Sequence, residues 1–116
     1  LTSIVIPSNI TEIGANAFDG CNMTTVTVEE GLRVLNEGAL RLSSLAQRIT
    51  LPASLQEIRT DGYMQTVCAN TVIIKSPNVK IEQGEVGAIW AQEIYAPSGS
   101  TAEQYAKQNG IEFHTL

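Results

Sequence analysis

The sequence repeats a short apolar–x–apolar segment five times at nearly constant spacing. The segments are Ile4-Val5-Ile6, Val26-Thr27-Val28, Ile49-Thr50-Leu51, Val72-Ile73-Ile74 and Ile94-Tyr95-Ala96. Their first residues, at positions 4, 26, 49, 72 and 94, are separated by 22, 23, 23 and 22 residues. Three positions before each segment stands an apolar residue: Leu1, Met23, Ala46, Ala69 and Ala91. A constant period of about 20 to 50 residues indicates a solenoid of stacked coils, each burying its apolar faces against its neighbours.

Further apolar residues recur at fixed distances after the first residue of each repeated segment. Nine residues after the first strand position stand Ile13, Leu35, Ile58 and Ile81, and fourteen after it stand Phe18, Leu40, Tyr63 and Val86. Side chains alternate along a strand, so Ile4 and Ile6 are expected to point inward and Val5 outward. A second apolar pair, Ile10 and Ile13 in the first coil, is expected to bury the opposite wall, and Ala17-Phe18 to close the coil as a helical turn. The third and fourth coils depart from this pattern, so looser or shifted segments are expected there.

The end of the chain has a different pattern. Ser100-Thr101-Ala102-Glu103 is a capping box that predicts a helix start, and Gly110 is placed to end that helix. Ile111-Glu112-Phe113 then repeats the strand pattern 17 residues after Ile94. We therefore expect a single domain over 1–116, with repeats starting near 1, 23, 46, 69 and 91 and a helix-plus-strand C-terminal cap over 98–116. Because the first strand has no comparable cap, we expect this domain to be the C-terminal part of a longer solenoid.

Charge and hydropathy exclude several classes of function. The formal net charge is −5 and no run of Lys or Arg occurs, which disfavours nucleic acid and anionic membrane surfaces as partners. No apolar stretch reaches the roughly 18 residues of a spanning helix, so membrane insertion is not expected. A signal peptide is not visible, and the chain begins with Leu1.

The first coil carries a family resemblance. The stretch Ser3-Ile-Val-Ile-Pro7, Ile10-Thr-Glu-Ile-Gly14 and Ala17-Phe18-Asp-Gly-Cys21 resembles the BspA-type leucine-rich repeat of bacterial surface proteins. Later coils lose the Ala-Phe and Cys positions. The resemblance implies an α/β fold, a right-handed leucine-rich-repeat solenoid with short parallel strands and a mostly irregular or short-helical convex side. It also implies a cell-surface or secreted protein that adheres to host proteins or to other cells.

Catalytic and metal-binding constellations are not expected from the residue pattern. Cys21 and Cys68 lie two repeats apart, roughly 10 Å at strand spacing, whereas a disulfide needs Cα atoms within about 7 Å. Cys21 is therefore expected to be a small core side chain rather than half of a disulfide. His114 is expected to be a solvated residue in the tail. The carboxylates of Asp19, Glu29, Glu30, Glu82 and Glu85 are expected to lie in turns and convex loops. We predict no enzyme activity, no cofactor and no metal site.

The outward strand positions are the candidate binding surface. The candidate protein-binding residues on this sheet face are Thr27, Arg48, Thr50, Ile73, Lys75, Glu93 and Tyr95. Ile73 and Tyr95 are neighbours with the character of interface anchors, although threonine-rich columns are also simply good strand formers. The leading hypothesis is a non-catalytic adhesin-like module that binds a protein, and the alternative is a structural spacer that presents another domain. Edge-to-edge self-association through the first strand is a further possibility. Trp90 is expected to pack against the cap rather than contact a partner.

Overall fold

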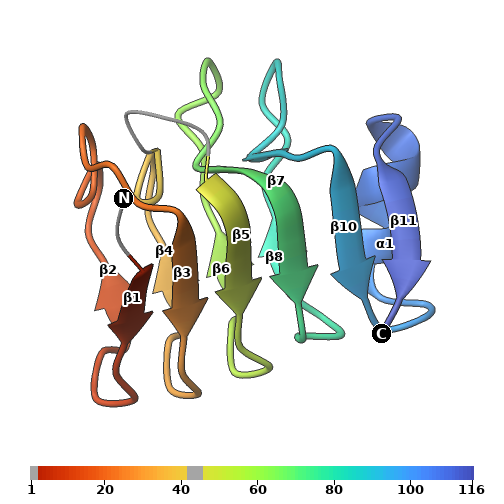
Figure 1. Cartoon of the computed structure of the whole chain (residues 1–116). Helices are drawn as coiled ribbons and strands as arrows, with labels where there is room; N and C mark the ends of the chain where they lie inside the picture. Colours follow the sequence, from red (N-terminus) through yellow and green to blue (C-terminus); the bar gives the residue numbers. More distant parts are fainter. Residues whose placement is uncertain (1–2, 42–45) are drawn as a thin grey trace.

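Among the described residues, the main sheet has seven strands, and six of them follow one another in sequence order. These strands lie side by side along one face of the solenoid (Figure 1). A computed structural model describes residues 3–41 and 46–116. The sheet runs β1 (Ser3–Ile6), β3 (Thr25–Val28), β5 (Ala46–Leu51), β7 (Val67–Ile74), β10 (Glu93–Ala96) and β11 (Glu112–Thr115), and every neighbouring pair is parallel. The start of β7 also pairs with β9 (Ile89–Trp90). Leu1, the predicted start of the first repeat, lies outside the described residues.

The register of the main sheet confirms the predicted repeat. The first apolar position of each of the five segments pairs with its counterpart in the next coil, through Ile4, Val26, Ile49, Val72 and Ile94. Ile94 then pairs with Phe113 in the last strand, two residues later than the predicted Ile111. The central four are buried, whereas Ile4 and Phe113 at the two ends of the row are half-buried. β1, β5 and β10 each end one residue before a proline, as expected for a residue that has no N–H to donate to the ladder.

The opposite wall is a second parallel sheet, which corrects the expectation of a mostly irregular or short-helical convex side. Its strands are only two residues long: β2 (Glu12–Ile13), β4 (Val34–Leu35), β6 (Glu57–Ile58) and β8 (Lys80–Ile81), in that order. In each, the second residue is apolar and points inward; Ile13, Leu35 and Ile58 are buried. Stacking the coils places N–H and C=O groups of successive two-residue segments opposite each other. A two-residue strand leaves too short an alternation to be recognised in the sequence.

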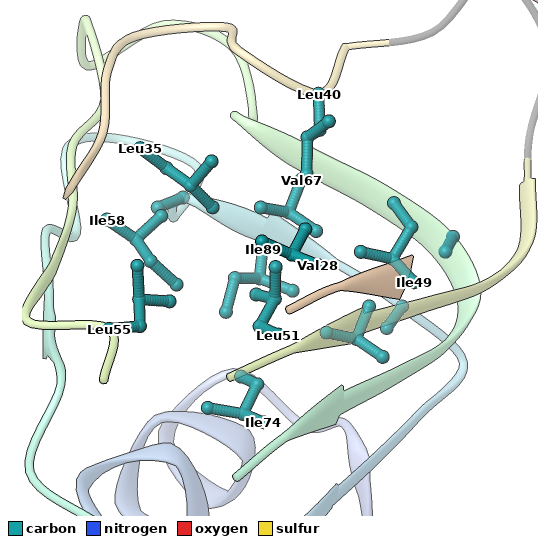
Figure 2. Close-up of a cluster of buried hydrophobic side chains, with 14 of the residues drawn as sticks. Val28, Leu35, Leu40, Ile49, Leu51, Leu55, Ile58, Val67, Ile74 and Ile89 are labelled. Atoms are coloured by element: carbon teal, nitrogen blue, oxygen red, sulfur yellow. The ribbon is translucent and has the colours of Figure 1, made fainter. Parts of the chain in front are cut away.

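The core lies between the two sheets (Figure 2). Leu35 and Ile58 reach it from the second sheet, while Ile49, Leu51 and Ile74 reach it from the main sheet, and all five are completely buried. Each coil supplies one layer of this core. The interior is therefore continuous along the solenoid axis, as stacked coils require.

The corners of the coils differ from one another. In the first coil, residues 15–20 form consecutive tight turns rather than a helix, and Ala17 is exposed. Cys21 is also exposed, so the expectation of a core side chain there is wrong. Leu40 is fully buried, whereas Tyr63 and Val86 in the same column are 73% and 44% exposed. The predicted shift of the third and fourth coils is thus confirmed, because their corner residues no longer reach the core.

Helix α1 (Thr101–Gln108) packs against β8, β10 and β11. Its predicted N-cap is confirmed: the Ser100 hydroxyl accepts a hydrogen bond from the Glu103 amide at 3.1 Å. The Glu103 carboxylate reaches back to the amide of Gly99, at 2.7 Å, rather than to that of Ser100. Beyond the C-cap residue Asn109, Gly110 has a φ of +69°, and the Ile111 amide donates to the carbonyl of Ala106 at 2.8 Å, which closes the helix in a Schellman motif.

Candidate functional site

Two outward columns of side chains run across the exposed face of the main sheet. The first contains Val5, Thr27, Thr50, Ile73, Tyr95 and His114. The second contains Ser3, Thr25, Arg48, Thr71, Glu93 and Glu112. Because these positions alternate with the buried ones, both columns lie on the same face, and neighbours within a column are separated by about 4.8 Å, the spacing between strands.

A hollow of about 480 Å³ lies on this face. It is lined by Thr25, Gln47, Arg48, Thr71, Ile73, Glu93 and Tyr95. Four of the predicted site residues therefore come together here: Arg48, Ile73, Glu93 and Tyr95. Thr27 and Thr50 lie in the first outward column but do not line the hollow, and Lys75 is an exposed residue just beyond the end of β7.

Gln47 belongs to the hollow but was not predicted as a site residue. Strict alternation places it inward, yet Gln47 and Arg48 are both exposed. The alternation breaks because both of their amides approach the carbonyl of Thr24, at 2.8 Å and 3.4 Å, as the chain bends into the sheet. Position 47 is polar in the sequence, as are the matching positions Thr24, Asn70 and Gln92 of other repeats, and this recurring polar position was the available sequence signal.

The hollow combines an apolar centre with charges on either side. Ile73 and Tyr95 supply the apolar surface, and Arg48 on β5 and Glu93 on β10 stand two strands apart across it. The Glu93 carboxylate is held by the hydroxyl of Thr71, which donates to its Oε2 at 2.8 Å. Such a surface can bind a protein segment that carries an apolar side chain between groups of opposite charge.

A histidine and two carboxylates lie together beside the hollow. His114 Nε2 is 3.2 Å from Glu93 Oε1 and 2.6 Å from Glu112 Oε2. The imidazole also stacks on the ring of Tyr95, with centroids 4.7 Å apart and an interplanar angle of 20°. The expectation that His114 is a solvated residue in the tail is therefore wrong.

The cluster was missed because the predicted last strand was placed too early. The pattern Ile111-Glu112-Phe113 indicated a strand ending at Phe113, whereas β11 extends through Thr115. Parallel pairing then sets Glu112 opposite Glu93 and His114 opposite Tyr95. The alternation Glu-x-His in β11, matching Glu-x-Tyr in β10, was the signal that could have located the cluster.

Cys21 and Cys68 are not joined in a disulfide. Cys68 is half-buried on β7, and burial raises the pKa of its thiol, which favours the less nucleophilic protonated form. Trp90 pairs with Cys68 through β9 and lies beside Asn109, Gly110 and Ile111 after the helix. Its side chain remains 42% exposed, so packing near the helix covers only part of the ring.

Comparison with known protein families supports the same architecture. Residues 1–101 match the BspA type leucine rich repeat region, in six copies. No curated protein and no solved structure matches the chain. In the part of the chain that the structure describes, no helix has the length and apolar character needed to cross a bilayer. The family match spans every strand of the main sheet through β10, and this chain belongs to the BspA-type leucine-rich repeat family.

Proposed function

We propose that this chain is a non-catalytic protein-binding scaffold whose contact surface is the outward face of the main sheet. The observation that carries the proposal is the hollow lined by Arg48, Ile73, Glu93 and Tyr95. Repeat families of this kind act as scaffolds and protein-interaction modules, which supports assigning an interaction role to this face. The remaining predicted residues, Thr27, Thr50 and Lys75, would form its rim.

Tyr95 is the anchor that the proposal depends on most. Tyrosine and arginine are enriched among the residues that dominate binding energy at protein interfaces. The stack on His114 restricts the Tyr95 ring before any partner arrives, so less conformational entropy is lost on binding. The flanking charges of Arg48 and Glu93 would orient the partner segment and would discriminate against partners with the reversed charge order.

We further propose a bacterial cell-surface or secreted setting, with adhesion to a host or bacterial surface protein as the biological role. The family relationship supports this setting. The alternative is a structural spacer, a rigid arm that presents another domain. The threonine-rich part of the face, at Thr25, Thr27 and Thr50, would serve a spacer equally well, since threonine is a good strand former.

Binding measurements with a matched pair of variants separate the two functions. The double variant Ile73→Ser/Tyr95→Ser should lose binding to immobilised bacterial cells or matrix proteins, because it removes the apolar centre of the hollow. The control Val5→Ser changes a residue of the same column that is 59% exposed and does not line the hollow, and it should bind normally. Unchanged binding by the double variant would refute this contact surface. Binding by neither the variants nor the original chain would favour the spacer.

We also propose that β1 can associate edge to edge with a second copy of this chain. Among the described residues, β1 pairs with β3 alone, which leaves its other edge unpaired. A second hollow, of about 350 Å³, adjoins it and is lined largely by apolar residues, including Ile4, Ile10 and Phe18. Unpaired strand edges next to apolar surface favour intermolecular pairing, and an edge lysine suppresses it. The change Ile4→Lys should therefore lower the dimer fraction in sedimentation velocity; a chain that stays monomeric at high concentration would exclude the association.

At the other end of the sheet, we propose that residues 98–116 act as the C-terminal cap of a single domain over 1–116. Ala102, Tyr105 and Ala106 of α1 are buried, and the helix covers β8 and β10. Its outer face carries Gln104, Lys107 and Gln108, which are exposed. Solenoids require such polar-faced terminal units to shield the last core layer. Removal of residues 98–116 should cause aggregation in light scattering, and a truncated chain that stays monomeric and folded would argue against a cap.

A further inference from the structure

We propose that Glu93, Glu112 and His114 form a binding site for a divalent transition-metal ion, with Zn²⁺ as the best-matched ion. One ligand atom from each residue lies within 4.8 Å of the others. The inference goes beyond the proposed protein-binding role, because it concerns a small ion at the β10–β11 end of the sheet. Glu93 belongs to both the hollow and the metal site. The sequence pattern predicted no metal there, since it placed His114 away from any carboxylate.

The register of the last two strands builds the site. Glu93 and Tyr95 on β10 stand opposite Glu112 and His114 on β11. All four side chains are on the outward face, because each strand contributes residues two positions apart. His114 therefore sits diagonally across from Glu93 and two residues along from Glu112. This position explains why a single imidazole nitrogen faces both carboxylates, at 3.2 Å and 2.6 Å.

The donor set selects among the metals. One imidazole nitrogen and two carboxylate oxygens suit Zn²⁺, whereas Ca²⁺ and Mg²⁺ prefer sets made entirely of oxygen. Zinc bonds of about 2.0–2.2 Å place two ligand atoms of a tetrahedral site roughly 3.4 Å apart. The Nε2–Oε1 separation of 3.2 Å to Glu93 is already close to this value. The shorter contact of 2.6 Å to Glu112 has to open only slightly, and that carboxylate side chain is 65% exposed.

Neighbouring groups orient two of the three ligands. The Thr71 hydroxyl donates to Glu93 Oε2, so that Oε1 is turned toward the imidazole. The Tyr95 ring stacks on His114 and fixes the imidazole plane. Interactions of this kind with metal ligands set ligand orientation and affinity. By contrast, both carboxylate oxygens of Glu30 accept hydrogen bonds from backbone amides of the next coil, at 2.9 Å and 3.0 Å, and are thus occupied structurally.

The site is open to solvent on one side. The side chains of His114 and Glu93 are 39% and 32% exposed, so an ion can enter without any movement of the backbone. Three protein ligands leave the fourth position of a tetrahedral Zn²⁺ to water. The arrangement is therefore an open three-ligand site rather than a closed four-ligand site.

Calorimetric titration of the tag-free chain with ZnCl₂ tests the proposal. A Cys21→Ser/Cys68→Ser background removes thiol ligands, and titration with CaCl₂ provides the comparison. One Zn²⁺ should bind per chain, with little or no heat from Ca²⁺. His114→Gln and Glu93→Gln should each weaken Zn²⁺ binding by about tenfold or more, and Thr71→Val by about tenfold. Glu85→Gln, which removes one exposed carboxylate elsewhere, should leave the affinity unchanged.

A spectroscopic measurement gives a second, site-specific readout. His114 is the single histidine of the sequence, so its imidazole NMR signals can be assigned directly. Those signals should shift on addition of Zn²⁺ but not of Ca²⁺, while circular dichroism shows that each variant keeps its fold. The proposal is overturned if the imidazole signals do not move, if His114→Gln binds Zn²⁺ as tightly as the parent chain, or if Ca²⁺ binds equally well.

Discussion

The Tyr105 hydroxyl satisfies both backbone groups of Ile89, donating to its carbonyl at 2.8 Å and accepting from its amide at 3.0 Å. A side chain from α1 thus takes the place of a neighbouring strand for β9. Burial raises the pKa of the Tyr105 hydroxyl, so it keeps its proton for this bridge through neutral pH.

Removal of that hydroxyl tests the bridge. Tyr105→Phe leaves the ring in place but strips two buried backbone groups of their partner, which should lower the free energy of unfolding by about 1–3 kcal/mol. Urea denaturation measures the change. The control Tyr63→Phe alters a ring that is 73% exposed and should have almost no effect. Equal stability of the two variants would mean that water replaces the bridge.

The inward row of the main sheet makes a second prediction. Ile49 is fully buried and pairs with Val26 on one side and Val72 on the other. Ile49→Ala should cost about 2–5 kcal/mol of unfolding free energy, because the central layers have little freedom to collapse around the cavity. Thr50→Ala, one residue along and half-exposed, should cost far less. Similar losses for both would refute the inward and outward assignment.

A close approach between coils predicts a requirement for glycine at position 31. Gly31 has a φ of +128°, and an added Cβ would overlap the carbonyl oxygen of Ser8 in the preceding coil. Gly31→Ala should therefore be destabilising by more than Gly99→Ala, where φ is +79° but no atom lies in the way. Thermal melts measure both variants: Gly99→Ala introduces backbone strain alone, whereas Gly31→Ala introduces backbone strain and a clash with Ser8. A smaller loss for Gly31→Ala would contradict the close packing of the first two coils.

The helix start predicts a specific dependence on pH. A hydrogen bond from Lys107 lowers the pKa of the Glu103 carboxyl, and the Gly99 amide lowers it further. Because the folded pKa lies below the unfolded one, Glu103 adds stability above its ordinary pKa of about 4.3, and this contribution is lost as the pH falls through the folded value. The melting temperature of the parent chain should therefore exceed that of Glu103→Gln at neutral pH. The difference should shrink toward zero in acid, and a constant difference would exclude the carboxylate as its source.

The proposed binding face shows which parts of a candidate site can be predicted from a repeat. The period located Arg48, Ile73, Glu93 and Tyr95 on one face, because the register of a solenoid follows from its spacing. Gln47 was not found, since the local bend at Thr24 breaks the alternation on which the prediction relied. His114 was not found either, because its own strand, β11, lies at the end of the chain, where the constant period no longer applies.

By itself, the sequence determined the stacking of coils, the inward row of the main sheet and the start of the final helix. Each of these depends on local periodicity or on capping chemistry within a few residues. Tertiary structure alone decided the second sheet, the exposure of Cys21 and the meeting of Glu93, Glu112 and His114. The physical reason is that these features depend on contacts between coils. A two-residue strand exists only when the next coil supplies its hydrogen-bond partners, and a three-residue cluster forms only when the last strand pairs in one register.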